Sequence, residues 1–431
     1  MNNQPNRIAF ISEHASPLAD LGGVDTGGQN VYVAQLAKHL ARQGHAVDIY
    51  TRKEDISIKT VVDWVPQIRV IHIEAGPVKV LPKEELLPYM PEFEQRMHNF
   101  IINENLQYDL THANFFMSGM VALGLKRSLG IPFVITFHAL GYIRRLHQQE
   151  EDKFPAERLT IEKMICHEAD QVIAECPQDR EDLIEHYGAL PEKIAIVPCG
   201  FSHTEFYPIN KETARRVLRI DLGEKVLLQL GRMVPRKGID NVIRSLATLK
   251  QKSAEKIKLL IVGGNKDDME ESNCPEYRRL CELAESLGVA DMVQFAGRKG
   301  RDKLKFYYAA ADVFITTPWY EPFGITPLEA MACGTPVIGS NVGGIKYSVV
   351  DGMTGALVPP NDPQALAEEV NALISNDDAL YQYGQNALTH VNTHFTWKKV
   401  ATQMEVVYKT VLRTTLNAFG KTAVKEDVAA A

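Results

Sequence analysis

The sequence predicts an α/β protein built from two doubly wound, Rossmann-like domains. Short apolar runs alternate with amphipathic stretches along the whole chain, which is the pattern of parallel strands joined by helices. The alternation stops at the turn-rich segment 197–208 and then starts again. At 431 residues the chain is also too long for one ordinary core. We therefore expect one domain at 1–205 and a second at 206–396.

The first domain is predicted to begin with a strand at Ile8–Ser12 and a helix from Gly28 to Gly44, in which apolar residues recur at helical spacing. Further apolar runs predict strands at 47–51, 68–73, 133–137 and 171–174. Helical stretches are predicted between them at 84–103 and 157–168.

The second domain repeats this order. Strands are predicted at 225–230, 258–262, 292–296 and 313–316, with helices at 238–250, 276–287 and 303–310. A long helix, Trp397–Phe419, is expected to pack back on the first domain. The last residues, Gly420–Ala431, lack an apolar face, and we expect them to be mobile.

The composition argues against several classes of function. The chain is 45% hydrophobic and 23% charged, as soluble globular proteins are. Its net charge of −7 argues against nucleic acid as a partner. No apolar run approaches the roughly 20 residues of a membrane-spanning helix, and the polar start, Met1–Arg7, does not resemble a signal peptide. Six scattered cysteines without a Cys-x-x-Cys pair favour reduced thiols in the cytoplasm and argue against zinc.

Several predicted strands are followed by loops of unusual composition, and open α/β sheets bind ligands at the carboxyl ends of their strands. The loop 22–29 is rich in glycine, but it lacks the nicotinamide and P-loop fingerprints, and an ordinary tight turn explains it equally well. His138 follows a strand and suits a sugar hydroxyl or a developing charge. A lone histidine is, however, more often structural.

The loop 230–238 carries Arg232 and Lys237 around a proline turn, which suits phosphate oxygens, although a solvated basic loop is the common alternative. The pair Gly263-Gly264 after the next strand is a weaker indication. The stretch from Glu321 to Glu329 is the strongest. It predicts a helix that begins near Thr326, whose free N–H groups and positive dipole end suit a diphosphate. An acid that complements the helix dipole would explain Glu329 but not the residues before it.

Together these loops resemble the retaining glycosyltransferases of family 4, which have two Rossmann-like doubly wound domains facing a central cleft (GT-B). The specific motifs are Glu321-Pro322-Phe323-Gly324-x-x-x-x-Glu329 and Gly231-Arg232-x-x-x-x-Lys237-Gly238. Within the family, segments 16–19 and 25–33 are similar to the inositol-phosphate glycosyltransferases of mycothiol synthesis. The segment 81–86 and the loop 25–29 are similar to sucrose-phosphate synthases.

The resemblance implies a hexosyltransferase that uses a nucleotide-diphosphate sugar, a uridine diphosphate sugar such as UDP-glucose. The donor would bind the C-terminal domain and the acceptor the N-terminal domain, with the anomeric configuration retained. No Asp-x-Asp occurs, which fits a site without metal or other cofactor. The implied catalytic residues are His138, Arg232, Lys237 and Glu321. The implied donor-binding residues are Gly27, Gly28, Gly231, Arg232, Lys237, Gly263, Arg298, Phe323, Gly324, Ile325, Thr326, Pro327, Leu328 and Glu329.

The resemblance also implies individual roles. Arg232 and Lys237 would hold the diphosphate and stabilise the leaving group, while Glu329 would bind the ribose hydroxyls. Glu321 would hold hydroxyls of the donor sugar, and its catalytic role in such enzymes is disputed. His138 would contact the sugar and support an oxocarbenium-like transition state.

The acceptor is less determined. The resemblance implies acceptor contacts from Gln29, Lys83, Asn114, His138, Arg144 and Arg158, with Arg145 nearby and Glu162 keeping an Arg-x-x-x-Glu spacing. Two positions depart from phosphate-binding relatives, because Phe115 stands where a tyrosine is expected and Ala139 where Ser or Thr is expected. A sugar phosphate, a neutral sugar and a lipid-linked acceptor therefore all stay open.

Alternative functions follow from the same motifs. One is a sucrose-phosphate synthase-like enzyme that joins UDP-glucose to fructose 6-phosphate. Another is a polysaccharide or lipid-linked-sugar transferase in peripheral contact with a membrane. A catalytically silent nucleotide-sugar-binding protein is the alternative outside enzymes, and the presence of all five expected polar positions disfavours it.

Overall fold

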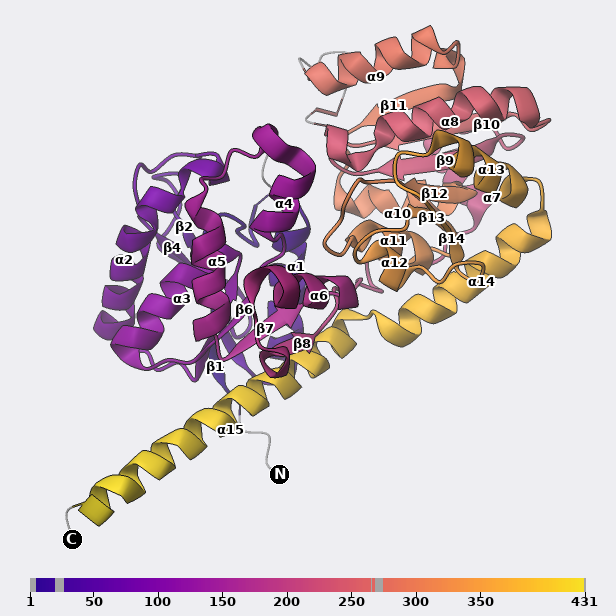
Figure 1. Ribbon diagram of the computed structural model, residues 1–431. Helices are drawn as coiled ribbons and strands as arrows, with labels where there is room; N and C mark the ends of the chain where they lie inside the picture. Colours follow the sequence, from indigo (N-terminus) through magenta and orange to yellow (C-terminus); the bar gives the residue numbers. More distant parts are fainter. Residues whose placement is uncertain (1–4, 20–26, 265, 268–273, 430–431) are drawn as a thin grey trace. The chain divides into compact units, whose positions relative to one another are not determined.

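The computed structural model describes residues 5–19, 27–264, 266–267 and 274–429. Their contacts divide them into two compact units, the first from residues 5–19, 27–198 and 398–429 and the second from 199–397. Each unit contains its own parallel sheet covered by helices, so the predicted fold class is confirmed (Figure 1). The division lies between Pro198 and Cys199, earlier than the boundary at 205 expected from the sequence.

The sheet of the first unit has the strand order β3-β4-β2-β1-β5-β6-β7-β8. Neighbouring strands are parallel except β3 and β4, and Ile8 of β1 lies opposite Val47 on one side and Leu110 on the other. The strands are β1 (Arg7–Ile11), β2 (Ala46–Arg52), β3 (Val61–Val65), β4 (Ile68–Ile73), β5 (Leu110–Asn114), β6 (Phe133–Thr136), β7 (Gln171–Ala174) and β8 (Ile194–Ile196).

Helices follow most of these strands. They are α1 (Gly28–Arg42), α2 (Met90–Asn103), α3 (Phe116–Leu129), α4 (Gly141–Gln148), α5 (Glu157–Glu168) and α6 (Pro177–Tyr187), with short 3₁₀ turns η1 (Lys83–Glu85), η2 (Leu87–Tyr89), η3 (Gln149–Glu151) and η4 (Pro191–Lys193). Helices α2, α3 and α5 pack side by side (Figure 1). Their buried faces meet β-branched and aromatic side chains of the sheet in one continuous apolar core.

The sheet of the second unit has the order β11-β10-β9-β12-β13-β14, and all its pairs are parallel. Its strands are β9 (Lys225–Leu230), β10 (Ile257–Val262), β11 (Val293–Gly297), β12 (Val313–Thr316), β13 (Val337–Ser340) and β14 (Gly355–Val358). Its helices are α7 (Lys211–Leu218), α8 (Ile239–Lys252), α9 (Pro275–Ser286), α10 (Arg301–Ala310), α11 (Ile325–Ala332), α12 (Ile345–Ser348), α13 (Pro363–Ile374) and α14 (Asp377–His394), with 3₁₀ turns η5 (Pro235–Lys237) and η6 (Ala290–Met292).

The last helix, α15 (Trp397–Ala429), belongs to the first unit from Lys398 onward. The hydroxyl of Tyr408 lies 2.6 Å from Nδ1 of His112 in β5, deep in that unit. The helix continues beyond Phe419, where the sequence analysis ended it. No proline follows Trp397, and a single Gly420 costs only about 1 kcal/mol in a helix.

One other expectation needs correction. The stretch 84–103 is not one helix, because Pro88 and Pro91 limit its start to 3₁₀ turns and α2 begins only at Met90. The turn-rich segment 197–208, expected to link the two domains, contains the division between the units and is packed in the second unit from Cys199 onward. Phe201 and Phe206 in it are each 1% exposed, and the N–H of Phe201 donates to the carbonyl of Phe395 at 2.9 Å. Within the described ranges, no helix is both long and apolar enough to span a bilayer.

Candidate active site

Four strands of the first unit end side by side, and a polar residue stands at each end. β1, β5, β6 and β7 are parallel neighbours. Glu13 follows β1, Asn114 ends β5, His138 follows β6 and Glu175 follows β7. The strands β2 to β4 lie on one side of β1, and the strands from β5 onward lie on its other side. Ligands of open α/β sheets bind outside the carboxyl ends of the strands at such a switch point.

His138 is held by contacts on both ring nitrogens. Its Nε2 lies 3.1 Å from Oδ1 of Asn114, and its Nδ1 lies 3.2 Å from a carboxylate oxygen of Glu175. The edge of the Tyr32 ring packs against it at 4.7 Å between centroids. The backbone φ of His138 is +58°, a left-handed conformation that costs a non-glycine residue on the order of 1 kcal/mol. Such strain is typical of functional positions.

The first turn of α1 reaches the same edge. Nε2 of Gln29 donates at 3.2 Å both to the hydroxyl of Ser12 and to the carbonyl of Asn114. The N–H of Gly27 donates to the side chain of Asn30 at 2.9 Å, and Gly28 is exposed at the helix start. The predicted residues 27–29 and Asn114 therefore lie at one place. The rest of that loop, 20–26, lies outside the described residues.

Arg158 lies inside an aromatic cage and is 2% exposed. Its guanidinium carbon lies 4.6–4.9 Å from the ring centroids of Phe115, Phe116 and Phe154. Nε donates to Glu162 at 2.7 Å, and Nη2 donates to the carbonyl of Ala139. Nη1 is buried without a hydrogen-bond partner among the described residues. A ligand reaches this cation only when one of these neighbours moves.

The other predicted basic residues also have acidic neighbours. Lys83 lies 4.0 Å and Arg144 lies 3.6 Å from the same oxygen of Glu84. Arg144 also donates to Asp152 at 2.7 Å, and Phe154 packs against it as well as against Arg158. Arg145 on the same helix is exposed. The structure thus brings Arg144 and Arg158 together at Phe154, and Glu84 links Lys83 to Arg144.

In the second unit the switch point of the strand order lies between β9 and β12. Two charged residues meet there. Lys237 ends the turn η5 after β9, and Glu321 lies in the loop after β12. Nζ of Lys237 donates a short hydrogen bond to Oε2 of Glu321, and Nη1 of Arg236 lies 3.5 Å from the same oxygen. Arg232 is exposed beside them.

Burial and charge act against each other in this pair. Burial favours the neutral carboxyl, but Lys237, Arg236 and Arg232 outweigh it and lower the pKa of Glu321 to about 2. Burial lowers the pKa of Lys237 to about 8, an effect that the Glu321 carboxylate opposes. Near pH 7 the two groups therefore form an ion pair with the neighbouring guanidinium groups in excess.

Glycines let the loops of this edge approach each other closely. A Cβ on Gly263 would lie 1.9 Å from the carbonyl oxygen of Gly231, and a Cβ on Gly238 would lie 2.0 Å from that of Thr317. Both glycines have positive φ, so another residue would be strained as well as crowded. Arg298, which follows β11, is partly buried, and its Nε lies 3.4 Å from Asp267.

The predicted helix start is observed at α11. Gly324 precedes it with φ +91°, and Ile325 and Thr326 occupy its first two positions, where N–H groups lack intrahelical acceptors. Pro327 has no N–H to satisfy, and Leu328 is buried. Phe323, 2% exposed, anchors the preceding loop.

Glu329 is the most enclosed of the charged residues predicted to bind the donor. It is 2% exposed, accepts from Tyr308 at 2.9 Å and pairs with Nη1 of Arg301 at 2.9 Å. Arg301 also pairs with Glu205 and stacks on Phe206 at 4.7 Å. Burial raises the pKa of Glu329, and Arg301 opposes this shift.

Sequence reasoning missed several residues that these sites use, namely Glu13, Tyr32, Glu175, Arg301 and Tyr308. Glu175 could have been found, because it is an acid directly after a predicted strand, as His138 directly follows its own. The pairing of Arg301 with Glu329 has no local pattern, since α10 and α11 meet only in the folded unit.

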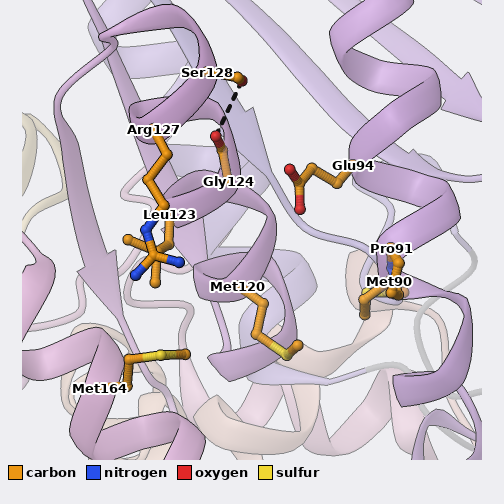
Figure 2. A pocket seen from close by; sticks show the side chains of 9 residues that line it. All are labelled: Met90, Pro91, Glu94, Met120, Leu123, Gly124, Arg127, Ser128 and Met164. Carbon is orange, nitrogen blue, oxygen red and sulfur yellow. Dashed lines mark hydrogen bonds between the residues drawn. The ribbon is translucent and has the colours of Figure 1, made fainter.

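Other features lie away from these strand ends. A pocket of about 410 Å³ opens between α2, α3 and α5, and Glu94 and Arg127 face it among methionines (Figure 2). None of its residues belongs to the predicted site. Over the part of the chain that the structure describes, no three His, Cys, Asp or Glu side chains are arranged to hold a metal ion.

Comparison with known proteins identifies the family. The model of glycosyltransferase family 4 matches residues 26–205, and that of glycosyl transferases group 1 matches residues 210–390. The chain is 35% identical over 407 residues to a D-inositol 3-phosphate glycosyltransferase of Corynebacterium diphtheriae, covering 93% of this chain and 94% of the relative. A second such enzyme, from Catenulispora acidiphila, is 34% identical over 413 residues, or 95% and 96% of the two chains.

Solved structures agree. Sucrose-phosphate synthase from Thermosynechococcus elongatus superposes with a TM-score of 0.86 and 34% identity, covering 95% of this chain and all of that one. The catalytic domain of starch synthase IV from Arabidopsis thaliana, at 18% identity and a TM-score of 0.74 over 95% and 100% of the chains, shares the fold. The chain therefore belongs to glycosyltransferase family 4 and is a glycosyltransferase of GT-B fold that transfers a sugar from a nucleotide sugar.

Proposed function

We propose that the protein transfers a hexosyl group from a uridine diphosphate sugar to an acceptor hydroxyl, with retention of configuration and without a metal ion. The observation that carries this proposal is the Lys237–Glu321 ion pair, flanked by Arg232 and Arg236 and close in sequence to the start of α11. Departure of a nucleoside diphosphate leaves negative charge on phosphate oxygens, and fixed cations and N–H groups stabilise such charge.

Each charged residue has a role in this scheme. Lys237 and Arg232 bind the diphosphate, and the N–H groups of Ile325 and Thr326 add donors at the helix start. Glu321 holds Lys237 in position and accepts from hydroxyls of the transferred sugar. Glu329, paired with Arg301, binds the ribose hydroxyls. His138 contacts the transferred sugar. Cations and a helix end thus take the part that a divalent metal plays elsewhere.

We assign the acceptor to the first unit and propose a phosphorylated polyol or sugar. The relatives in the comparison are named for phosphate-bearing substrates or products. Three cations are available there, since Arg144 and Arg158 meet at Phe154 and Glu84 links Lys83 to Arg144. Gln29 and Asn114 supply polar groups.

A neutral acceptor is the second candidate, and one observation favours it. Each of the three cations already has a carboxylate neighbour, respectively Glu84, Asp152 and Glu162. Phe115 and Ala139 also offer no side-chain oxygen to a phosphate. A sugar or lipid-linked acceptor without charge would leave these ion pairs intact.

A donor-by-acceptor screen tests the proposal. UDP-glucose, other UDP-hexoses and ADP- and GDP-sugars are each combined with inositol phosphate, fructose 6-phosphate and neutral sugars, and released nucleoside diphosphate is measured. We expect a UDP-hexose and a phosphorylated acceptor to give the fastest release, unchanged by EDTA. A requirement for added Mg²⁺, or a product with inverted anomeric configuration by NMR, would contradict the mechanism. Nucleotide-sugar binding without any transfer would support the silent binding protein instead.

A further inference from the structure

Glu175 was not part of any motif, yet it contacts the one histidine that the proposed function uses. We propose that Glu175 is a positioning residue that, together with Asn114, holds the His138 ring with a proton on each nitrogen. The inference rests on the proposed function only for its effect on catalysis. The charge state itself follows from hydrogen bonds of the first unit.

Asn114 determines the proton on Nε2 of His138. The side-chain nitrogen of Asn114 donates to the carbonyls of Ile11 and His112 at 3.3 and 3.2 Å. A flipped amide would turn its oxygen toward these two carbonyls, which is unfavourable because all three atoms are acceptors. The Asn114 oxygen must therefore face Nε2 of His138, 3.1 Å away, and Nε2 must carry a proton to donate.

Glu175 determines the proton on Nδ1. Its carboxylate lies 3.2 Å from Nδ1, and the side chains of His138 and Glu175 are only 9% and 4% exposed. With Nε2 already protonated, a neutral ring would turn an Nδ1 lone pair toward a carboxylate. A second ring proton replaces that repulsion with a charge-assisted hydrogen bond. The ring is then an imidazolium whose charge Glu175 cancels.

The surrounding groups allow this arrangement. Asp179 of α6 is a second acid beside Glu175, and its carboxylate accepts from the N–H of Glu175 at 2.8 Å. Burial and the charge of Glu175 raise the pKa of Asp179 to about 8, so Asp179 is mostly neutral near pH 7. His112 of β5 also faces His138 and is neutral, because burial lowers its pKa to about 3. Tyr32 of α1 packs against the ring in a T-shaped contact.

The consequence for glycosyl transfer is electrostatic. An oxocarbenium-like transition state carries positive charge at the sugar, and a lone imidazolium would oppose it. Paired with Glu175, the ring keeps its orientation and its Nδ1 proton but adds no net charge. In Glu175→Gln the ring loses that proton together with the charge-assisted hydrogen bond that orients it, so kcat should fall more than the KM for the donor rises.

Nitrogen-15 NMR of histidine-labelled full-length protein tests the charge state without any substrate, with the His138 signals assigned through His138→Gln. We expect both ring nitrogens of His138 to be protonated at pH 7 in the parent protein and only Nε2 in Glu175→Gln. Glu181→Gln, an exposed acid on the same helix α6, is the matched control and should leave the ring unchanged. A singly protonated ring in the parent protein would overturn the proposal.

Kinetics supply the second measurement. In Glu175→Gln we expect kcat to fall about 10-fold or more with little change in donor KM, as when a partner that fixes a catalytic histidine is altered. Glu175→Asp should recover part of the loss. A Glu175→Gln enzyme with the parent kcat would overturn the positioning role. If the protein transfers no sugar at all, the NMR result stands independently, so the two failures are distinguishable.

Discussion

Lys237 and Glu321 are 84 positions apart in sequence, yet Nζ of the lysine donates a short hydrogen bond to Oε2 of the glutamate at the carboxyl edge of the second sheet. The strands that precede them are β9 and β12. These two strands are neighbours because β10 and β11 lie on one side of β9 and the chain then returns to place β12 on its other side. The pair therefore links two motifs that the sequence keeps separate.

Replacement of Lys237 by alanine should remove one cation from the leaving group. We expect kcat to fall about 100- to 1,000-fold, the usual effect of losing one fixed donor to a developing charge. Initial rates of nucleoside diphosphate release measure it. The control is Lys252→Ala, which removes an exposed lysine on α8 that pairs only loosely with Glu368 at 3.5 Å. Full activity in Lys237→Ala would remove this residue from the mechanism.

The same lysine should set an alkaline limit on activity. Burial lowers the pKa of Lys237 to about 8, so its positive charge is lost as pH rises through that value. We expect kcat/KM, which reports the free enzyme, to decline above about pH 8. Arginine keeps its charge to far higher pH, so the remaining activity of Lys237→Arg should lack this decline. If kcat/KM declines in the same way in both proteins, a group other than Lys237 causes the decline.

Arg301 should stabilise the second unit by compensating a buried charge. Its removal in Arg301→Ala leaves Glu329, which is almost inaccessible, without its cation. We expect a loss of about 3 kcal/mol in the free energy of unfolding, as for other broken buried pairs. The double variant Arg301→Ala with Glu329→Gln should regain part of it, because the uncompensated charge is gone. Urea titration measures the free energy of unfolding of both variants. If the double variant loses as much stability as Arg301→Ala does, an uncompensated charge is not the cause.

Tyr408 should hold α15 to the first unit through its hydrogen bond with His112. Tyr408→Phe leaves a buried imidazole nitrogen without its partner, which should cost about 1–3 kcal/mol. Tyr381→Phe, on an exposed tyrosine of α14, is the matched control and should change stability little. Thermal unfolding followed by circular dichroism compares the two. Equal stability of both variants would show that the hydrogen bond contributes nothing net.

His112 should make the first unit sensitive to acid. Burial lowers its pKa from 6.5 to about 3, so between these values the unfolded chain binds a proton that the folded chain does not. Stability therefore rises with pH across this window and is lost as pH falls from 6.5 toward 3. His112→Gln should flatten this dependence in urea titrations at several pH values. If the pH dependence of stability is the same in His112→Gln, other histidines cause it.

Much of the site could be predicted because its residues follow strands directly. His138, Arg232, Gly263 and Glu321 stand in loops whose preceding apolar runs are short, regular and buried. β5 could not be predicted in this way, because its sequence, Leu-Thr-His-Ala-Asn, is polar. It lies in the centre of the sheet only because Tyr408, Thr136 and His138 satisfy its buried polar groups.

The sequence by itself determined the alternation of strands and helices, the two sheets and the family, since periodicity and short motifs are local properties. The tertiary structure alone decided which charges meet: Lys237 with Glu321, Arg301 with Glu329, and Glu175 with His138. These pairs join residues from different strand ends and helices, and their partners are fixed by strand order and packing. The electrostatics at the carboxyl ends of the strands in each unit is therefore a property of the folded chain.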